Sequence, residues 1–153
     1  MTKRLDYAAI APDGMKAMAG VHSYVAHCGL GKAFVELVYL RVSQINGCAY
    51  CIDLHTRALL KEGVTIEKLA LVSVWREAGA LFDAREQAAL AWAESVTRVS
   101  ETGAPDDAFA AVSAQFDQKE VVDLTLAISL MNAYNRMAIS FRAPPAAAKS
   151  VQG

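Results

Sequence analysis

The 153-residue chain carries no excess of charge of either sign, because 16 Asp and Glu residues offset 15 Lys and Arg residues. The basic residues are interspersed with acidic ones and form no stripe, so we expect no nucleic-acid partner. The sequence also lacks an apolar run of the roughly 20 residues that a bilayer-spanning helix requires. Its start leads into no apolar segment with a small-residue cleavage site. We therefore expect a cytoplasmic protein with no membrane partner.

Cysteine is scarce. The chain has three cysteines, Cys28, Cys48 and Cys51, and an odd number cannot form a closed disulfide framework. In a reducing cytoplasm, a close cysteine pair is more often catalytic or metal-binding than structural. Charged residues make up only 20% of the chain, whereas 54% is hydrophobic. A chain of this length buries one core without a covalent staple. We expect part of the apolar surplus to lie between subunits of a homo-oligomer.

Strict alternation of apolar and polar residues is absent, and apolar residues instead recur three and four positions apart. This pattern predicts an all-α fold with a single helical domain at residues 15–143. An N-terminal segment at 1–14, irregular over 7–12, precedes the domain, and a flexible tail at 144–153 follows it. Caps and turns divide the domain at Asn46-Gly47, at Gly63, and at the capping boxes Asp83–Glu86 and Asp117–Glu120. The predicted helices cover residues 15–28, 33–45, 48–62, 66–75, 84–99, 107–116 and 118–141.

The chemistry-bearing residues gather at the start of the third predicted helix, where Cys48, Cys51 and His55 follow one another at spacings of three and four. At about 100° per residue, these spacings place the two sulfurs and the imidazole within about 60° of one another. Both cysteines fall in the first turn, where unpaired backbone N–H groups and the helix dipole stabilise an anion. That environment lowers the pKa of a thiol and favours the reactive thiolate. We expect the three side chains to share one exposed flank of the helix.

Glu36 is the candidate partner of His55. It lies eleven residues before Gly47, and His55 lies eight residues after that glycine. If the chain doubles back at this turn, the offsets correspond to about 16 and 12 Å along the two helices, so the side chains can meet. A carboxylate bonded to one imidazole nitrogen fixes the tautomer and strengthens the other nitrogen as a base.

The cysteine pair has two alternatives to redox chemistry, a structural metal site and inert core thiols. Zinc would need a fourth ligand beyond Cys48, Cys51 and His55, which only the fold could supply from Cys28, His27 or Glu36. A thioredoxin fold is disfavoured because no βαβ pattern surrounds the motif.

Two other groups of polar residues are interpreted as structural and not as part of the site. His22 and His27 are interpreted as polar-face residues of the first helix. Asn132, Asn135 and Arg136 cluster on the last helix, and we interpret them as partners in buried hydrogen bonds to neighbouring helix ends or to another subunit.

At these residues the chain resembles the alkylhydroperoxidase AhpD-like branch of the carboxymuconolactone decarboxylase family. The resemblance covers residues 5–142, and its main pattern is Glu-x11-Cys-x2-Cys-x3-His preceded by Asn-Gly. The segments that carry it are FVEL at 34–37, VSQINGCAYCIDLH at 42–55, LAWAE at 90–94 and NAYNR at 132–136. One position departs from the peroxidase pattern: Tyr50 stands between the cysteines, where that pattern has a histidine.

The resemblance implies an AhpD-like helical bundle that assembles into trimers or hexamers and reduces hydroperoxides, without a metal or nucleotide cofactor. By that analogy Cys51 attacks the peroxide, Cys48 resolves the sulfenic acid, and His55 and Glu36 relay protons. An external dithiol or thiol reductant then restores both cysteines. The alternatives are a non-catalytic thiol redox sensor or assembly protein, and a metal-stabilised helical domain. Decarboxylation is not expected, because the decarboxylases of this family generally lack the cysteine pair.

Overall fold

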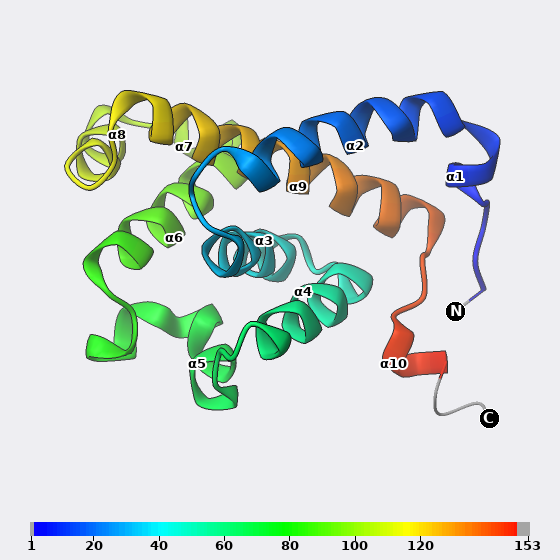
Figure 1. The fold of residues 1–153 in the computed structure, drawn as a ribbon, viewed down its shortest axis with the longest axis horizontal. Coiled ribbons are helices and arrows are strands. Elements are labelled where there is room, and N and C mark those ends of the chain that lie inside the picture. The colour runs from blue at the N-terminus through cyan, green and yellow to red at the C-terminus, as the bar shows by residue number, and fades with distance from the viewer. Residues whose placement is uncertain (1, 150–153) are drawn as a thin grey trace.

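The computed structural model describes residues 2–149, and every regular element among them is a helix (Figure 1). This confirms the predicted all-α class. No helix in this part of the chain is both long and apolar enough to cross a bilayer. The elements are α1 (Tyr7–Ile10), α2 (Pro12–His27), α3 (Lys32–Asn46), α4 (Ala49–Lys61), α5 (Ile66–Leu71), η1 (Val72–Glu77), η2 (Gly79–Leu81), α6 (Ala84–Thr97), α7 (Val99–Thr102), α8 (Asp106–Ser113), α9 (Gln118–Phe141) and α10 (Ala146–Lys149), where η denotes a 3-10 helix.

Helix α3 runs through the middle of the molecule, and α4, α6 and α9 pack around it (Figure 1). Its middle turn cannot be divided into a polar and an apolar face, because four successive residues are all buried: Leu37, Val38, Tyr39 and Leu40. A helix that is apolar on every side must be enclosed by others. Helices α2 and α9 lie side by side across one side of α3 and run in opposite directions.

Two hydrophobic clusters hold the helices together, and α3 contributes to both. The first contains Cys48 and Cys51 and extends to fully buried Ile128 of α9. In the second cluster, Leu40 of α3 packs with Leu59 of α4. The cysteine pair is therefore part of the hydrophobic core, at the point where α4 begins.

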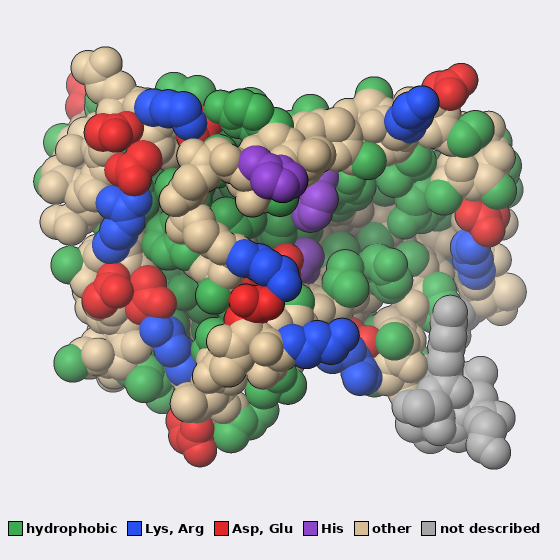
Figure 2. Space-filling view, in the orientation of Figure 1, with side chains coloured by type: hydrophobic (Ala, Val, Ile, Leu, Met, Phe, Trp, Pro, Cys, Tyr) green, Lys and Arg blue, Asp and Glu red, His purple; other side chains and the backbone are tan. Residues whose placement is uncertain are grey.

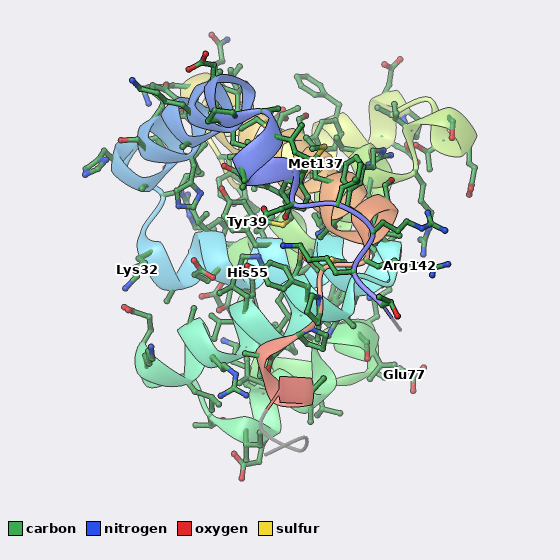
Figure 3. The ribbon with its side chains drawn as sticks, turned by 90° about the vertical axis from the view of Figure 1, so that its right-hand side faces the viewer. Lys32, Tyr39, His55, Glu77, Met137 and Arg142 are labelled. Atoms are coloured by element: carbon green, nitrogen blue, oxygen red, sulfur yellow. The ribbon has the colours of Figure 1, made fainter. Side chains whose placement is uncertain are left out.

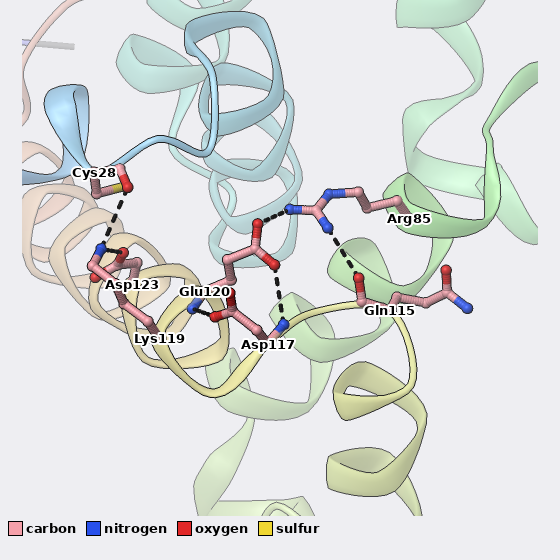
Figure 4. Close-up of polar contacts among 7 residues, drawn as sticks. All are labelled: Cys28, Arg85, Gln115, Asp117, Lys119, Glu120 and Asp123. Carbon is pink, nitrogen blue, oxygen red and sulfur yellow. Dashed lines mark hydrogen bonds and ion pairs between the residues drawn. The ribbon is translucent and has the colours of Figure 1, made fainter.

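The predicted capping boxes are both present. The Asp83 carboxylate accepts a hydrogen bond from the Glu86 N–H, and the Glu86 carboxylate accepts one from the Asp83 N–H. Asp117 and Glu120 form the same reciprocal pair at the start of α9 (Figure 4). Arg85 of α6 donates a further hydrogen bond to Glu120, so this cap also ties α6 to α9.

The N-terminal segment differs from the prediction. Residues 7–12, expected to be irregular, contain α1, and α2 begins at Pro12 instead of residue 15. The Asp6 carboxylate caps α1 by accepting a hydrogen bond from the Ala9 N–H. Proline suits the first turn of α2 because it has no N–H group that would lack a partner there. The Tyr7 ring packs on Phe141 at the end of α9, with ring centroids 5.5 Å apart.

Several other boundaries differ by a few residues. The helix predicted at 66–75 ends as an α-helix at Leu71 and continues as η1, in which Val74 has non-helical angles. The stretch predicted at 84–99 is divided into α6 and α7, and α8 is shorter than the predicted 107–116. Within the tail predicted to be flexible, α10 occupies Ala146–Lys149, and residues 150–153 lie outside the described part of the chain.

Candidate active site

The turn between α3 and α4 places the two cysteines. Gly47 ends α3 in the left-handed conformation (φ 69°), which glycine adopts without the steric cost of a side chain. Cys48 is the N-cap residue of α4, and Cys51 lies in the first turn. The Cys48 N–H donates to the Ser43 carbonyl at 3.0 Å, which holds the reversal of the chain. The prediction that both sulfurs lie at the start of one helix is confirmed.

The two sulfurs are in direct contact. Both cysteines are free thiols, and their Sγ atoms are 2.8 Å apart in a hydrogen bond. This hydrogen bond with Cys51 lowers the pKa of Cys48 to about 7 despite the burial of the thiol, and backbone N–H groups at the helix start act in the same direction. The same contact, together with burial, raises the pKa of Cys51. The pair therefore loses one proton readily and the second with difficulty.

His55 lies one turn further along α4, and Glu36 reaches it from α3. The Nδ1 atom of His55 is 2.7 Å from Oε2 of Glu36. The Tyr39 ring lies against the imidazole, with ring centroids 5.2 Å apart (Figure 3). With Nδ1 bonded to the carboxylate, Nε2 is the nitrogen left to exchange protons. The predicted meeting of these two side chains across the helical hairpin is confirmed.

A cavity of about 310 Å³ lies beside the cysteine pair. Cys51 and His55 both line it, whereas Cys48 does not. The wall is mainly apolar and also presents phenol and imidazole groups. Its other lining residues are Tyr7, Ala8, Met15, His22, Tyr50, Leu54, Met131, Tyr134 and Ala138. Histidine side chains gather on the face shown in Figure 2, next to a mainly hydrophobic surface.

The expectation that the two sulfurs and the imidazole lie on an exposed side of the helix is wrong. Cys48, Cys51 and His55 are only 1%, 3% and 5% exposed. The reason is tertiary: segments from α1, α2 and α9 pack beside the start of α4 and, with it, line the cavity that Cys51 and His55 face. The side of Cys51 that faces the cavity is therefore bordered by mainly apolar side chains.

Three titratable residues of the cavity wall are not singled out by the sequence as site residues. Tyr7 and Tyr134 come from opposite ends of the chain, and His22, interpreted as a polar-face residue of the first helix, also lines the wall. The His22 ring lies 6.4 Å from the Tyr134 ring, measured between centroids. No spacing signal could have revealed these residues, because they meet only when α1, α2 and α9 assemble.

The asparagines of α9 form partly or fully buried hydrogen bonds with the end of α3, as the sequence predicts. Arg136 differs from the prediction, because it is exposed and bonds to Asn132 of its own helix. Asn46 Nδ2 donates to the side-chain oxygens of Asn132 (3.0 Å) and Asn135 (2.9 Å). Asn135 Nδ2 donates to Ser43 Oγ at 3.1 Å and lies 3.4 Å from the Met131 sulfur. This network anchors α9 directly behind the turn that carries Cys48.

The remaining candidate ligands lie elsewhere. The Cys28 carbonyl is near Lys119, on the side of α2 that faces the start of α9 (Figure 4). His27 Nδ1 pairs with the Ser23 carbonyl at 2.7 Å. Across residues 2–149, no group of three or more His, Cys, Asp or Glu side chains is arranged to hold a metal ion.

The family model of the carboxymuconolactone decarboxylase family matches residues 12–95, which include α3, the cysteine pair and His55. The chain belongs to this family. Enzymes occur among its relatives, including those named alkyl hydroperoxide reductase AhpD. AhpD from Corynebacterium aurimucosum is 47% identical over 45 residues, which cover 29% of this chain and 25% of that protein.

Two relatives match this member of the family over nearly its whole length. The uncharacterised protein YdfG from Bacillus subtilis is 36% identical over 140 residues, covering 92% of this chain and 95% of that protein. A crystal structure of a protein of unknown function from Agrobacterium tumefaciens, suggested to be an antioxidant defence protein AhpD, superposes with a TM-score of 0.90. It is 40% identical and covers 94% of this chain and 98% of that chain. The fold is thus AhpD-like.

Proposed function

We propose that the chain is a thiol-dependent peroxidase that uses Cys48 and Cys51 to reduce organic hydroperoxides. The observation that carries the proposal is the position of Cys51, which faces a cavity together with His55 while contacting Cys48 at 2.8 Å. A sulfur that is both accessible to a peroxide and in contact with a second sulfur has what a two-cysteine cycle requires. The AhpD relatives named as alkyl hydroperoxide reductases also support it.

The cycle begins when the Cys51 thiol passes its proton to His55 and its sulfur attacks the terminal oxygen of the hydroperoxide. The O–O bond breaks, the electron pair leaves on the alkoxide, which takes a proton, and Cys51 becomes a sulfenic acid. The Cys48 thiolate then attacks the Cys51 sulfur, and hydroxide leaves and is protonated to water. An external dithiol or thiol reduces the resulting disulfide. No metal or nucleotide is needed at any step.

His55 and Glu36 serve this cycle as a proton relay. The imidazole lines the cavity beside Cys51, so Nε2 can take the thiol proton and return a proton to the leaving oxygen. Glu36 holds Nδ1 at 2.7 Å and stabilises the imidazolium while it exists. Tyr50 occupies the position between the cysteines and also lines the cavity. Its phenol can donate a hydrogen bond but is a poor base near neutral pH.

The cavity wall favours an organic peroxide over a small polar one. Met15, Leu54, Met131 and Ala138 offer apolar contacts to a hydrocarbon group. The phenols of the cavity can bind the peroxide oxygens by hydrogen bonds. The cycle also depends on a supply of reducing equivalents, which favours the cytoplasm as its compartment.

The test is turnover of an organic hydroperoxide with dithiothreitol as the reductant. We expect sustained consumption by the natural chain, none by Cys51→Ser, and a single equivalent by Cys48→Ser. Cys28→Ser is the matched control and should keep full activity, since Cys28 does not line the cavity. Oxidation that stops after one equivalent in the natural chain would contradict the peroxidase and support a redox sensor.

We also propose that the chain forms a homo-oligomer. Phe109 and Val122 are 52% and 58% exposed and line one surface hollow, and Leu126 follows one turn later on α9. Contiguous apolar surface of this kind is typical of an interface between subunits. Size-exclusion chromatography with light scattering should show an oligomer that Val122→Glu weakens; a monomer at all concentrations would contradict the proposal.

A further inference from the structure

His22 of α2 is shared by two cavities. It lines the cavity of about 310 Å³ that Cys51 and His55 face, which we call the peroxide cavity. It also lines a second cavity, of about 130 Å³. The side chain is exposed, and its imidazole forms no hydrogen bond with another residue of the described part of the chain. His22 can therefore exchange protons with solvent and with molecules in either cavity.

The second cavity carries groups that bind water. Lys32 and Glu36 line it, and so does Tyr39, which is fully buried. The Tyr39 hydroxyl has no hydrogen-bond partner among residues 2–149. A buried hydroxyl needs a partner, and a cavity of about 130 Å³ has room for several water molecules. Water bound there by Tyr39 and Glu36 would give His22 a proton supply separate from the peroxide cavity.

His22 and His55 are separate titrating groups, and Tyr39 lies next to both (Figure 3). The Tyr39 ring is 5.2 Å from the His55 ring and 6.2 Å from the His22 ring, measured between centroids. His55 Nδ1 is held by Glu36 at 2.7 Å, whereas no carboxylate of the described residues holds His22. The wall of the peroxide cavity therefore presents two imidazoles with different surroundings.

The proposed cycle needs a proton that His55 does not supply. His55 takes the proton of the Cys51 thiol and returns it to the alkoxide, so the imidazole is then neutral again. When the Cys48 thiolate attacks the sulfenic acid, the S–S bond forms, the S–O bond breaks, and the electron pair leaves on hydroxide. This hydroxide comes from Cys51, which lines the peroxide cavity. It must gain one proton, ultimately from solvent, to become water.

The other titratable groups of the two cavities are poorly suited to give this proton. Burial raises the pKa of Tyr7 and of Tyr134 above the ordinary phenol value, so neither phenol is a strong acid near neutral pH. Lys32 lines only the second cavity and pairs with Glu62. An imidazole gains and loses a proton near neutral pH, which leaves His22 as the suitable donor.

We propose that His22 is a second acid–base group of the site, which protonates the hydroxide released from Cys51 when the disulfide closes. The imidazolium of His22 gives one proton to hydroxide, directly or through a water in the peroxide cavity, and water is formed. The neutral imidazole then regains one proton from solvent by way of the second cavity, past Glu36 and Tyr39. This inference rests on the proposed function, because it concerns one step of that cycle.

The two steps of oxidation separate this role from a structural one. Reduced His22→Gln, in a Cys28→Ser background, is mixed with cumene hydroperoxide, and the sulfenic acid is trapped with dimedone and measured by mass spectrometry. Attack on the peroxide should keep its rate, because His55 and Glu36 are unchanged. Closure of the disulfide should slow at least about tenfold, so that the sulfenic acid accumulates. Added imidazole, a small mobile acid, should restore closure.

His27→Gln is the matched control. His27 lies on the same helix, is also exposed, lines neither cavity, and pairs through Nδ1 with the Ser23 carbonyl. This variant should oxidise like the natural chain. Equal closure rates in the two variants would overturn the inference. Equal slowing of attack and closure in His22→Gln, or slow closure that imidazole does not restore, would overturn it as well.

A measurement without peroxide keeps this test apart from that of the proposed function. The reduced pair is converted to a mixed disulfide with 2,2′-dithiodipyridine or with methyl methanethiosulfonate, and the thiol expelled on closure is followed. Thiopyridone leaves without gaining a proton, whereas methanethiolate is a strong base whose departure is helped by an acid. His22→Gln should slow only the release of methanethiol, and equal rates of both releases in variant and natural chain would overturn the inference. If this contrast is present but the natural chain consumes no hydroperoxide, the proposed function alone is contradicted.

Discussion

Glu36 and His55 meet at 2.7 Å across the α3–α4 hairpin, although 19 positions of sequence separate them. The carboxylate comes from the enclosed central helix and is itself mostly buried, so its charge acts on the imidazole with little screening. The imidazole in turn lines the cavity beside Cys51. This contact is the part of the site most open to a direct test of proton transfer.

The first prediction concerns this pair. Glu36→Gln keeps a hydrogen-bonding group at Nδ1 but removes the charge that stabilises the imidazolium, so the peroxidase rate should fall about tenfold. His55→Gln removes the base itself and should cost about a hundredfold. Steady-state consumption of an organic hydroperoxide measures both. Glu62→Gln is the control, because Glu62 pairs with Lys32 outside the cavity; equal rates in all three variants would contradict the relay.

The second prediction is a pH profile. The hydrogen bond with Cys51 lowers the pKa of Cys48 to about 7, so the pair gains its thiolate as the pH rises through about 7. The raised pKa of Cys51 means that no second thiolate follows near neutrality. The thiolate absorbance of the reduced Cys28→Ser protein should therefore rise with pH and level off above about pH 8. A midpoint near the ordinary thiol value of about 8.5 would contradict this.

The third prediction compares two glycines at the ends of α4. Gly47 and Gly63 both have positive φ (69° and 82°), and an added Cβ meets nothing within 4 Å at either one. Alanine should therefore lower the free energy of unfolding by about 1 kcal/mol at each position, through backbone strain alone. Only Gly47→Ala should also change the alkylation rate of the cysteine pair, because Cys48 follows it directly. Equal effects on reactivity would show that the α3–α4 turn does not position the pair.

The fourth prediction concerns Glu94, a buried carboxylate in α6. Its oxygens accept hydrogen bonds from Arg41 (2.7 Å), Trp75 (2.9 Å) and Arg76 (2.5 Å). Burial alone would raise its pKa, but these hydrogen bonds outweigh burial and lower it. A carboxyl whose pKa is lower in the folded chain than in the unfolded chain stabilises the fold at pH values above its unfolded pKa. That stability is lost as the pH falls through the lower, folded pKa.

Glu94→Ala should therefore cost about 3 kcal/mol near neutral pH, since it leaves the mostly buried Arg41 guanidinium without its partner. Below about pH 4 the difference from the natural chain should shrink, because the natural carboxyl is then being protonated. Chemical denaturation at several pH values measures both effects. Glu101→Ala serves as the control, because that residue is exposed; a constant difference at every pH would contradict the argument.

Interactions within a few residues explain why so much of the helical framework is predictable. The capping boxes at Asp83 and Asp117 and the left-handed Gly47 and Gly63 act over one turn of chain, so composition and spacing reveal them. The meeting of Glu36 with His55 is predictable for a related reason: one short turn joins two regular helices, and the rise per residue then fixes which positions face each other. Where no such signal exists, as at Val74 in η1, the predicted helix boundary is wrong.

The order of amino acids is enough to establish the helical class, the caps, and the position of two sulfurs and an imidazole on one helix, because each depends on local backbone geometry. Helix packing, in contrast, buries these groups, gives Cys51 and not Cys48 access to the cavity, and brings Asn135 to the end of α3. Asn135 and Ser43 are 92 residues apart in the chain, and they bond only because α9 packs on α3. Contacts between distant helices follow no fixed spacing in sequence, so these features could not be foreseen from it.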